Sequence, residues 1–192
     1  MAKTIDLLKE FEAASSLNRT ALDRVRLDAN EIAIIPFTSE AEPIDIHYCK
    51  EPDINDYIAC NGKNCHLCKI GREKVTRRLL PVYIPASHAV GVLPVGTSLR
   101  PRALWPQLAQ VLKDGLRRAV FISRVQGDSY TVTSMPLQAD VADGAEVIKT
   151  FLEDHQKGTI QLDSVYPRVT NEQLAAIPEI DRMLKLRGIK VG

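Results

Sequence analysis

Hydrophobic residues repeat along the chain with two different periods, and the change between them predicts the order of the elements. Near the start, apolar residues at helical spacing predict a helix over residues 4–14, followed by a second short helix or a loop over 18–30. Further on, short apolar runs, some with alternating polarity, predict strands over residues 32–37, 44–47, 79–84, 89–95, 120–125 and 129–135. Gly127, in the short connection between the last two strands, is typical of a hairpin turn.

Helical spacing returns at three later places. The pattern predicts helices over residues 101–119, 143–155 and 171–187, with the last one interrupted near Pro178. Pro81 falls inside one of the expected strands, and because proline donates no hydrogen bond to a ladder, that strand should be an edge strand or contain a bulge.

All four cysteines and two of the four histidines lie in one stretch, from His47 to Cys68. Cys65 and Cys68 form a C-x-x-C pair, and Cys60 precedes the pair by five residues. Zinc in structural sites takes four nitrogen or sulfur ligands in a tetrahedron. The spacing therefore predicts one structural zinc ion, with the three cysteines as ligands and either His47 or Cys49 as the fourth.

Other uses of clustered cysteines fit this sequence less well. Disulfide frameworks belong to small secreted domains, whereas this chain has 192 residues and its first residues lack a cleavable signal pattern. A redox C-x-x-C has no need of two further cysteines nearby. Lys69 stands where haem attachment would require histidine, and Asn64 breaks the P-C-x-x-C pattern of zinc deaminases.

The expected elements predict a mainly β, α+β fold. About five short strands with one helix late in their order are most simply closed as a small five-stranded barrel of the OB type, with the metal loop inserted between strands. A zinc ribbon beside an α+β sandwich is the alternative. Residues 1–29 would form an N-terminal helical arm, residues 30–137 the core, and residues 138–192 a C-terminal helical extension.

The net charge of +1 hides an uneven distribution. Residues 60–137 contain twelve basic and three acidic side chains, whereas residues 31–59 contain one basic and seven acidic. A basic segment of this kind is either a solvated face or the footprint of a polyanion, and its continuation from the metal loop into a strand favours the polyanion. No apolar run is long enough to span a membrane, and free cysteines indicate a reducing compartment such as the cytoplasm.

The metal stretch resembles that of the zinc-containing single-stranded-DNA-binding proteins of T-even and related bacteriophages. The family has a histidine, twelve residues, a cysteine and then a C-x-x-C pair, which His47, Cys60, Cys65 and Cys68 match. The gap from Cys60 to Cys65 is shorter here than in the T-even protein. The similarity covers about residues 30–137, and together with tetrahedral ligand counting it favours His47 over Cys49 as the fourth ligand.

The resemblance implies an OB fold with a zinc subdomain at about residues 46–75, and single strands bound in a basic, aromatic-lined cleft between the two. No motif transfers the DNA contacts residue by residue, so the candidates come from this segment's own cations and aromatic rings. They are Lys63, Lys69, Arg72, Lys74, Arg77 and Arg78 for phosphate, and Tyr48, Tyr57, Tyr83 and Tyr130 for stacking. Each tyrosine could instead pack in the core, because a strand side chain points to one of two faces. For the same reason, only one of Arg77 and Arg78 should face the cleft.

We therefore expect sequence-independent binding of single-stranded DNA in replication, recombination or repair, without enzymatic activity. The zinc would be structural, since four protein ligands leave no open position for a reactive water. Replication or recombination proteins are the expected partners, no membrane is involved, and the location would be the bacterial host cytoplasm if the protein is phage-encoded. One alternative is a zinc-stabilised adaptor that docks proteins through its C-terminal helices without contacting nucleic acid. The other, a nuclease or recombination enzyme, would need clustered acids for magnesium, but the acids of residues 31–59 are scattered.

Overall fold

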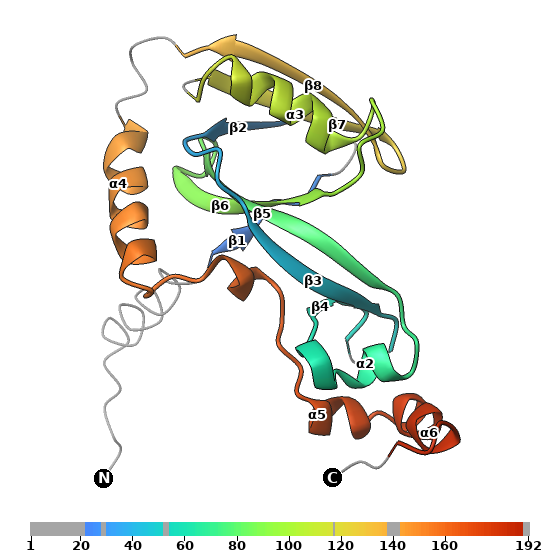
Figure 1. Ribbon diagram of the computed structural model, residues 1–192. Coiled ribbons are helices and arrows are strands. Elements are labelled where there is room, and N and C mark those ends of the chain that lie inside the picture. Colours follow the sequence, from blue (N-terminus) through green and yellow to red (C-terminus); the bar gives the residue numbers. More distant parts are fainter. Residues whose placement is uncertain (1–21, 28–29, 52–53, 117, 138–142, 190–192) are drawn as a thin grey trace, which may run out of the picture.

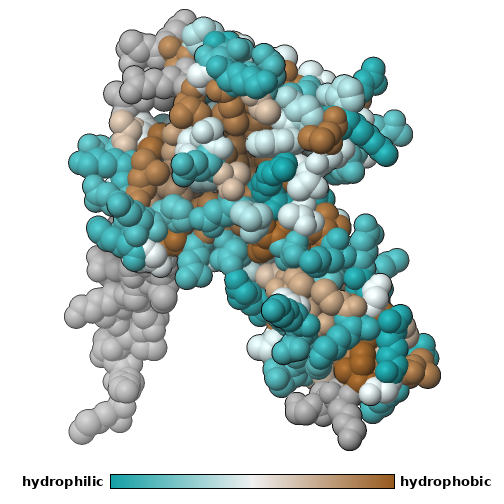
Figure 2. Space-filling model, in the orientation of Figure 1, coloured by the Kyte–Doolittle hydropathy of each residue, from teal (hydrophilic) through white to brown (hydrophobic). Residues whose placement is uncertain are grey.

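Two long antiparallel strands join the two lobes of the molecule (Figure 1). They are β3 (Glu42–Cys49) and β5 (Lys74–Ile84), paired from Glu42↔Leu79 to His47↔Lys74. The computed structural model describes residues 22–27, 30–51, 54–116, 118–137 and 143–189. The lobes remain distinct in the space-filling view, where hydrophilic side chains cover much of the lower lobe (Figure 2).

The fold is mixed α+β, as the sequence predicts, with eight strands and five α-helices among the described residues. The other strands are β1 (Asp23–Arg24), β2 (Ile32–Pro36), β4 (Asp56–Ala59), β6 (Ala89–Gly96), β7 (Arg118–Gln126) and β8 (Ser129–Pro136). The helices are α2 (His66–Lys69), α3 (Leu104–Lys113), α4 (Asp143–Gln156), α5 (Asn171–Ala175) and α6 (Pro178–Leu186), with short 3-10 turns η1 (Gly62–Asn64) and η2 (Leu162–Val165). None of these helices is long and apolar enough to cross a membrane.

The upper lobe is one curved sheet with the strand order β1-β6-β5-β2-β7-β8. Strand β2 joins its two halves, because Ile32–Ile34 pair with β7 whereas Ile35 and Pro36 pair with β5. Among the described strands, β1 and β6 are the one parallel pair. The order is open: within the described part of the chain no pairing joins β6 to β8, so the expected closed barrel is not present as a hydrogen-bonded ring. Helix α3 packs against both of these strands instead.

The core of this lobe lies under α3. Leu104, Leu108 and Val111 recur at helical spacing and are buried against strand residues such as Leu93 and Ile122. Burying each large aliphatic side chain contributes about 1.5–3 kcal/mol. The apolar stripe of α3 is therefore the main reason that this helix lies across the sheet.

Strand β5 is not an edge strand, so the expectation drawn from Pro81 is wrong. It pairs with β6 from Arg77 to Ile84, and its other side is shared by two partners. Strand β3 ends its pairing at Leu79 and β2 begins at Val82, so Pro81 falls in the gap between them. A residue without an N–H is tolerated in a central strand where the ladder changes partner.

Some of the remaining predicted elements are confirmed and others differ from the structure. The hairpin of β7 and β8 and the helix α4 are confirmed, and Pro178 stands at the start of α6, which confirms the break near this residue. Helix α3 is shorter than the predicted 101–119. The helix expected over 4–14 lies outside the described residues. In the following segment, expected to be a short helix or a loop, Asp23–Arg24 form a short strand, with Val25 buried after it.

The C-terminal segments pack on both lobes. Phe151 of α4 and Leu162 of η2 join a cluster with Ile46 and Leu79, at the junction of the lobes. Helices α5 and α6 lie against the lower lobe (Figure 1), where Leu174 and Leu184 are fully buried. The lower lobe thus obtains much of its core from the end of the chain.

Candidate functional site

Four side chains of the lower lobe converge on one point. His47 comes from β3, Cys60 follows β4, and Cys65 and Cys68 lie at the start of α2 and within it. Their ligand atoms all lie within 4.8 Å of one another. His47 Nε2 is 3.6 Å from Cys65 Sγ and 3.3 Å from Cys68 Sγ, and the sulfurs of Cys60 and Cys68 are 3.6 Å apart.

These distances fit a tetrahedral zinc site. With Zn–S bonds of roughly 2.3 Å, the sulfurs of such a site are about 3.8 Å apart. The donor set of three thiolates and one imidazole is one that zinc takes in closed structural sites. The four residues are therefore positioned to bind a single metal ion, as expected for one structural zinc.

The neighbouring backbone fixes the histidine for this role. His47 is 0% exposed, and its Nδ1–H donates to the carbonyl oxygen of Glu73 at 2.9 Å. In a neutral imidazole that donates through Nδ1, the free lone pair is on Nε2, the ring nitrogen that lies beside the sulfurs. Metal-binding histidines are commonly held in this way, with the nitrogen that does not bind the metal hydrogen bonded to a carbonyl or carboxylate oxygen.

Cys49, the alternative fourth ligand, is not part of the cluster. It is buried in an apolar group with Leu67, Ile70 and Leu184. Burial is the main cause that raises the pKa of its thiol, so Cys49 stays neutral and packs as a small hydrophobic residue. The structure therefore places His47 in the cluster of candidate metal ligands and Cys49 in the hydrophobic core beside it.

The pKa values of two of these thiols shift in opposite directions. Burial, together with the neighbouring Cys60 and Cys65, raises the pKa of Cys68 to about 12. Burial also opposes ionisation of Cys65, but hydrogen bonds from the backbone of Cys68 and Asn61 outweigh it and lower the pKa of this thiol. A zinc ion would supply the positive charge that lets all three sulfurs ionise together.

Asn171, the first residue of α5, holds the loop that carries the cysteines. Its Oδ1 accepts hydrogen bonds from the backbone N–H of His66 at 3.1 Å and from Asn61 Nδ2 at 3.3 Å. Its Nδ2 donates to the carbonyl oxygen of Asn64 at 3.1 Å, and its own carbonyl accepts from His66 Nδ1. The metal loop is thus tied to the C-terminal helices by one side chain.

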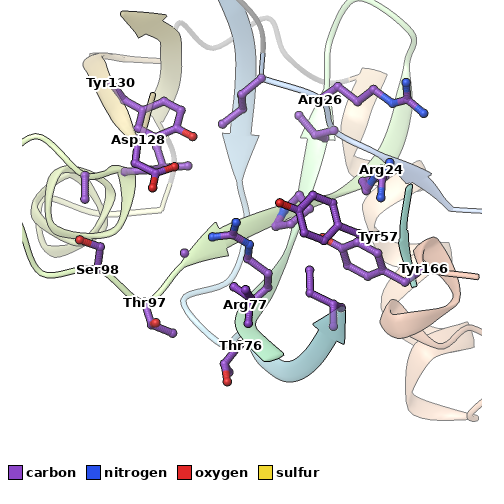
Figure 3. A pocket seen from close by; sticks show the side chains of 18 of the residues that line it. Arg24, Arg26, Tyr57, Thr76, Arg77, Thr97, Ser98, Asp128, Tyr130 and Tyr166 are labelled. Carbon is purple, nitrogen blue, oxygen red and sulfur yellow. The ribbon is translucent and has the colours of Figure 1, made fainter. Parts of the chain in front are cut away.

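A second feature lies between the lobes. A cleft of about 450 Å³ is lined by three arginines, three tyrosines and residues of β5, β6 and α3. The charged and aromatic members are Arg24, Arg26, Arg77, Tyr57, Tyr130 and Tyr166. Figure 3 shows Tyr130 on one side of this inter-lobe cleft and Arg77, Tyr57 and Arg24 on the other.

Arg77 extends into the cleft from β5, opposite Gly96 of β6. A Cβ atom at Gly96 would lie 2.7 Å from Arg77 Nη1, so a larger residue there would displace the guanidinium, which ends a flexible side chain, from its present position. Arg77 and Arg26 form no ion pair with a carboxylate of the described residues, and their charges are available to a ligand.

Arg24 is held more tightly. It forms hydrogen bonds to both carboxylate oxygens of Asp56, at 2.9 and 3.1 Å, and its guanidinium lies 5.1 Å from the ring centroid of Tyr166. Burial raises the pKa of Tyr166, against the opposing effect of the arginines. Arg24 therefore joins β1 to β4 and to the C-terminal segment across the floor of the cleft.

Of the cations predicted to contact phosphate, only Arg77 lines the cleft. Arg78 points elsewhere and lies 4.5 Å from the ring centroid of Trp105, as the alternation of a strand requires. The other four cluster around the lower lobe. There Arg72 pairs with Glu51 at 3.0 Å and Lys74 with Asp45 at 2.7 Å, whereas Lys63 and Lys69 are exposed.

The predicted stacking residues are also divided. Tyr57 and Tyr130 line the cleft, and Tyr48, 44% exposed, packs against Tyr57 with ring centroids 5.1 Å apart. Tyr83 is only 1% exposed and hydrogen bonds to His88, so its ring is core and is no longer a stacking candidate.

Arg24, Arg26 and Tyr166 were not among the predicted site residues. The alternation of Arg24, Val25 and Arg26 is a strand pattern that could have indicated two arginines on one face. Nothing local marks Tyr166, which reaches the cleft only because η2 packs at the junction of the lobes.

Comparisons with known proteins give no relative: no protein-family model, no curated protein and no solved structure matches this chain.

Proposed function

We propose that this protein binds single-stranded DNA without regard to sequence, in replication, recombination or repair, and that its zinc site is structural. The observation that carries the proposal is the inter-lobe cleft, which is lined by tyrosine rings and by guanidinium groups that form no ion pair with the described residues. Proteins that hold single strands combine a basic groove for the phosphates with aromatic rings on which bases stack. Arg26 and Arg77 would supply the first, and Tyr57 and Tyr130 the second.

The strand order supports an OB-like fold for the upper lobe. If β2, β5, β6, β7 and β8 are numbered one to five, the observed order is 3-2-1-4-5, with α3 between the third and fourth strands. A barrel of the OB type has this sequence of neighbours and would be closed by pairing of its third and fifth strands. The cleft beside such a lobe, facing a metal-bearing lobe, is also what the resemblance to the bacteriophage single-strand-binding proteins implies.

We propose a binding role and no catalysis. A zinc ion held by His47 and three cysteines has its four positions filled by protein, so it would shape the lobe without activating water. Among the described residues, only Asp56 and Asp128 bring carboxylates to the cleft, and Asp56 is engaged by Arg24.

The adaptor alternative depended on the C-terminal helices as a docking surface. Leu174, Ile180 and Leu184 are instead buried against the zinc lobe, with at most 1% of each exposed. Apart from Leu186, which is exposed, the large apolar side chains of α5 and α6 are therefore used within the molecule, which favours the nucleic-acid proposal.

Fluorescence anisotropy with labelled oligonucleotides tests the proposal. Mixed-sequence single strands and oligothymidine should bind alike, duplex of the same length should bind more weakly, and affinity should fall steeply with salt. Equal binding of duplex and single strand, or binding that is insensitive to salt, would contradict it and return the adaptor alternative to first place.

A further inference from the structure

The inter-lobe cleft continues into a second pocket along the loop before α3. This pocket is lined by Arg100, Pro101 and Arg102 of the loop and by Ser129 at the hairpin of β7 and β8. Ser98, Ala103 and Asp128 line both pockets, so the two are contiguous. None of the cations predicted from the sequence lies here.

The backbone of this loop is fixed on the hairpin. The carbonyl oxygen of Arg102 accepts from the N–H of Tyr130 at 2.9 Å, and Gln107 Nε2 donates to the carbonyl oxygens of Arg102 and Tyr130 at 3.1 and 2.9 Å. The N–H of Ala103 donates to the carbonyl of Arg100 at 2.8 Å. The loop thus presents its side chains from a preorganised backbone, which lowers the entropic cost of binding a ligand.

The charges of this pocket suit a phosphate backbone. Arg100 and Arg102 are exposed, and neither forms an ion pair within the described chain segments. Asp128 lies where the two pockets meet. An aspartate carboxylate only accepts hydrogen bonds, so it would repel a phosphate but could accept a hydrogen bond from the amino group of a base. The two arginines would therefore contact the phosphate backbone, and Asp128 a base.

We propose that a single strand leaving the inter-lobe cleft continues over this second pocket, where Arg100 and Arg102 neutralise two of its phosphates. This inference rests on the proposed function and adds a second segment to the same site. It makes the length of the oligonucleotide the variable that separates the two segments. Short strands would fill the cleft alone, whereas longer strands would engage both pockets.

The test is anisotropy titration of full-length R100A/R102A and wild type with oligothymidines of about 4, 8 and 16 nucleotides, which cover the site sizes of OB folds. Both substitutions keep the backbone hydrogen bonds of the loop. The double variant should bind the longest strand with a log–log salt slope flattened by about 1.4, at about 0.7 per lost phosphate contact, and the shortest strand as wild type does. The matched control is K113A/K149A, which removes the same charge from two exposed lysines that line neither pocket and should leave all slopes unchanged.

Three results would overturn the inference while leaving the proposed function standing. In the first, wild type binds long strands and R100A/R102A binds every length as tightly as wild type does. In the second, R100A/R102A is weakened to the same extent at all lengths. In the third, it is weakened no more than K113A/K149A. Failure of the wild type to bind any single strand would overturn the proposed function and the inference with it.

Discussion

Replacing Asn171 by alanine should loosen the zinc lobe specifically. The substitution removes three hydrogen bonds of one side chain, two that it accepts and one that it donates, and all of them hold residues 61–66 around the cysteine ligands. Each such bond contributes about 0.5–1.5 kcal/mol net. Because Asn171 is partly exposed, the lower value applies, and the expected loss is about 1.5 kcal/mol.

The assay is the rate at which zinc passes from the protein to a chromogenic chelator. If the metal leaves through local opening of this lobe, a loss of about 1.5 kcal/mol makes release faster by about tenfold. Urea unfolding of the same samples should show a comparable decrease in the free energy of unfolding.

Gln107→Ala is the matched control. The Gln107 amide also donates to three carbonyl oxygens, those of Arg102, Ala103 and Tyr130, but in the upper lobe. Its loss should lower stability without accelerating zinc release. If both variants release zinc at the same rate, or if Asn171→Ala releases it as slowly as wild type, the assigned role of Asn171 is wrong.

Two further substitutions and one truncation test the metal centre and the packing around it. Cys68→Ser should lose its zinc, measured by elemental analysis as less than one ion per chain, and because the energy of metal binding in such sites contributes to folding, the zinc lobe should also be less stable. A variant that keeps one zinc ion per chain would contradict the assigned ligand set. Ending the chain after Val165 removes three fully buried residues of α5 and α6. Their burial contributes about 4.5–9 kcal/mol, at about 1.5–3 kcal/mol each, so the shortened protein should lose its zinc. A folded, zinc-loaded product would contradict the role of this packing. Tyr166→Phe should remove a loss of stability at alkaline pH: burial raises the pKa of Tyr166 above its ordinary 10.0, so its stabilisation is present below about pH 10 and declines as pH rises through the folded value. Urea titrations above pH 10 should show a steeper decline for wild type than for the variant.

The sequence predicted those features that are encoded locally. The hairpin of β7 and β8 follows from alternating residues around Gly127, and the metal cluster from cysteine spacing, which required only that β3 bring His47 alongside. The fourth ligand needed more than spacing. His47 and Cys49 lie two apart on one strand face, and the packing of Cys49 against Leu67 separates their roles.

The cleft was harder to predict because its residues meet only through tertiary packing. Arg24 and Asp56 are 32 positions apart, and no local pattern pairs them. Period-two alternation shows that a strand has two faces without showing which is core. Tyr83 became core because α4 covers it: a Cβ atom at Gly144 would lie 2.9 Å from its ring.

The measurement that most directly tests whether the cleft holds single strands compares Arg77→Ala with Arg78→Ala. The two arginines are adjacent in β5, but one lines the cleft and the other lies over Trp105. Salt-dependent anisotropy titration with oligothymidine should give a log–log slope flattened by about 0.7 for Arg77→Ala, and the wild-type slope for Arg78→Ala even if that variant is less stable. Equal slopes for wild type and Arg77→Ala, or a change confined to Arg78→Ala, would contradict the placement of DNA in this cleft.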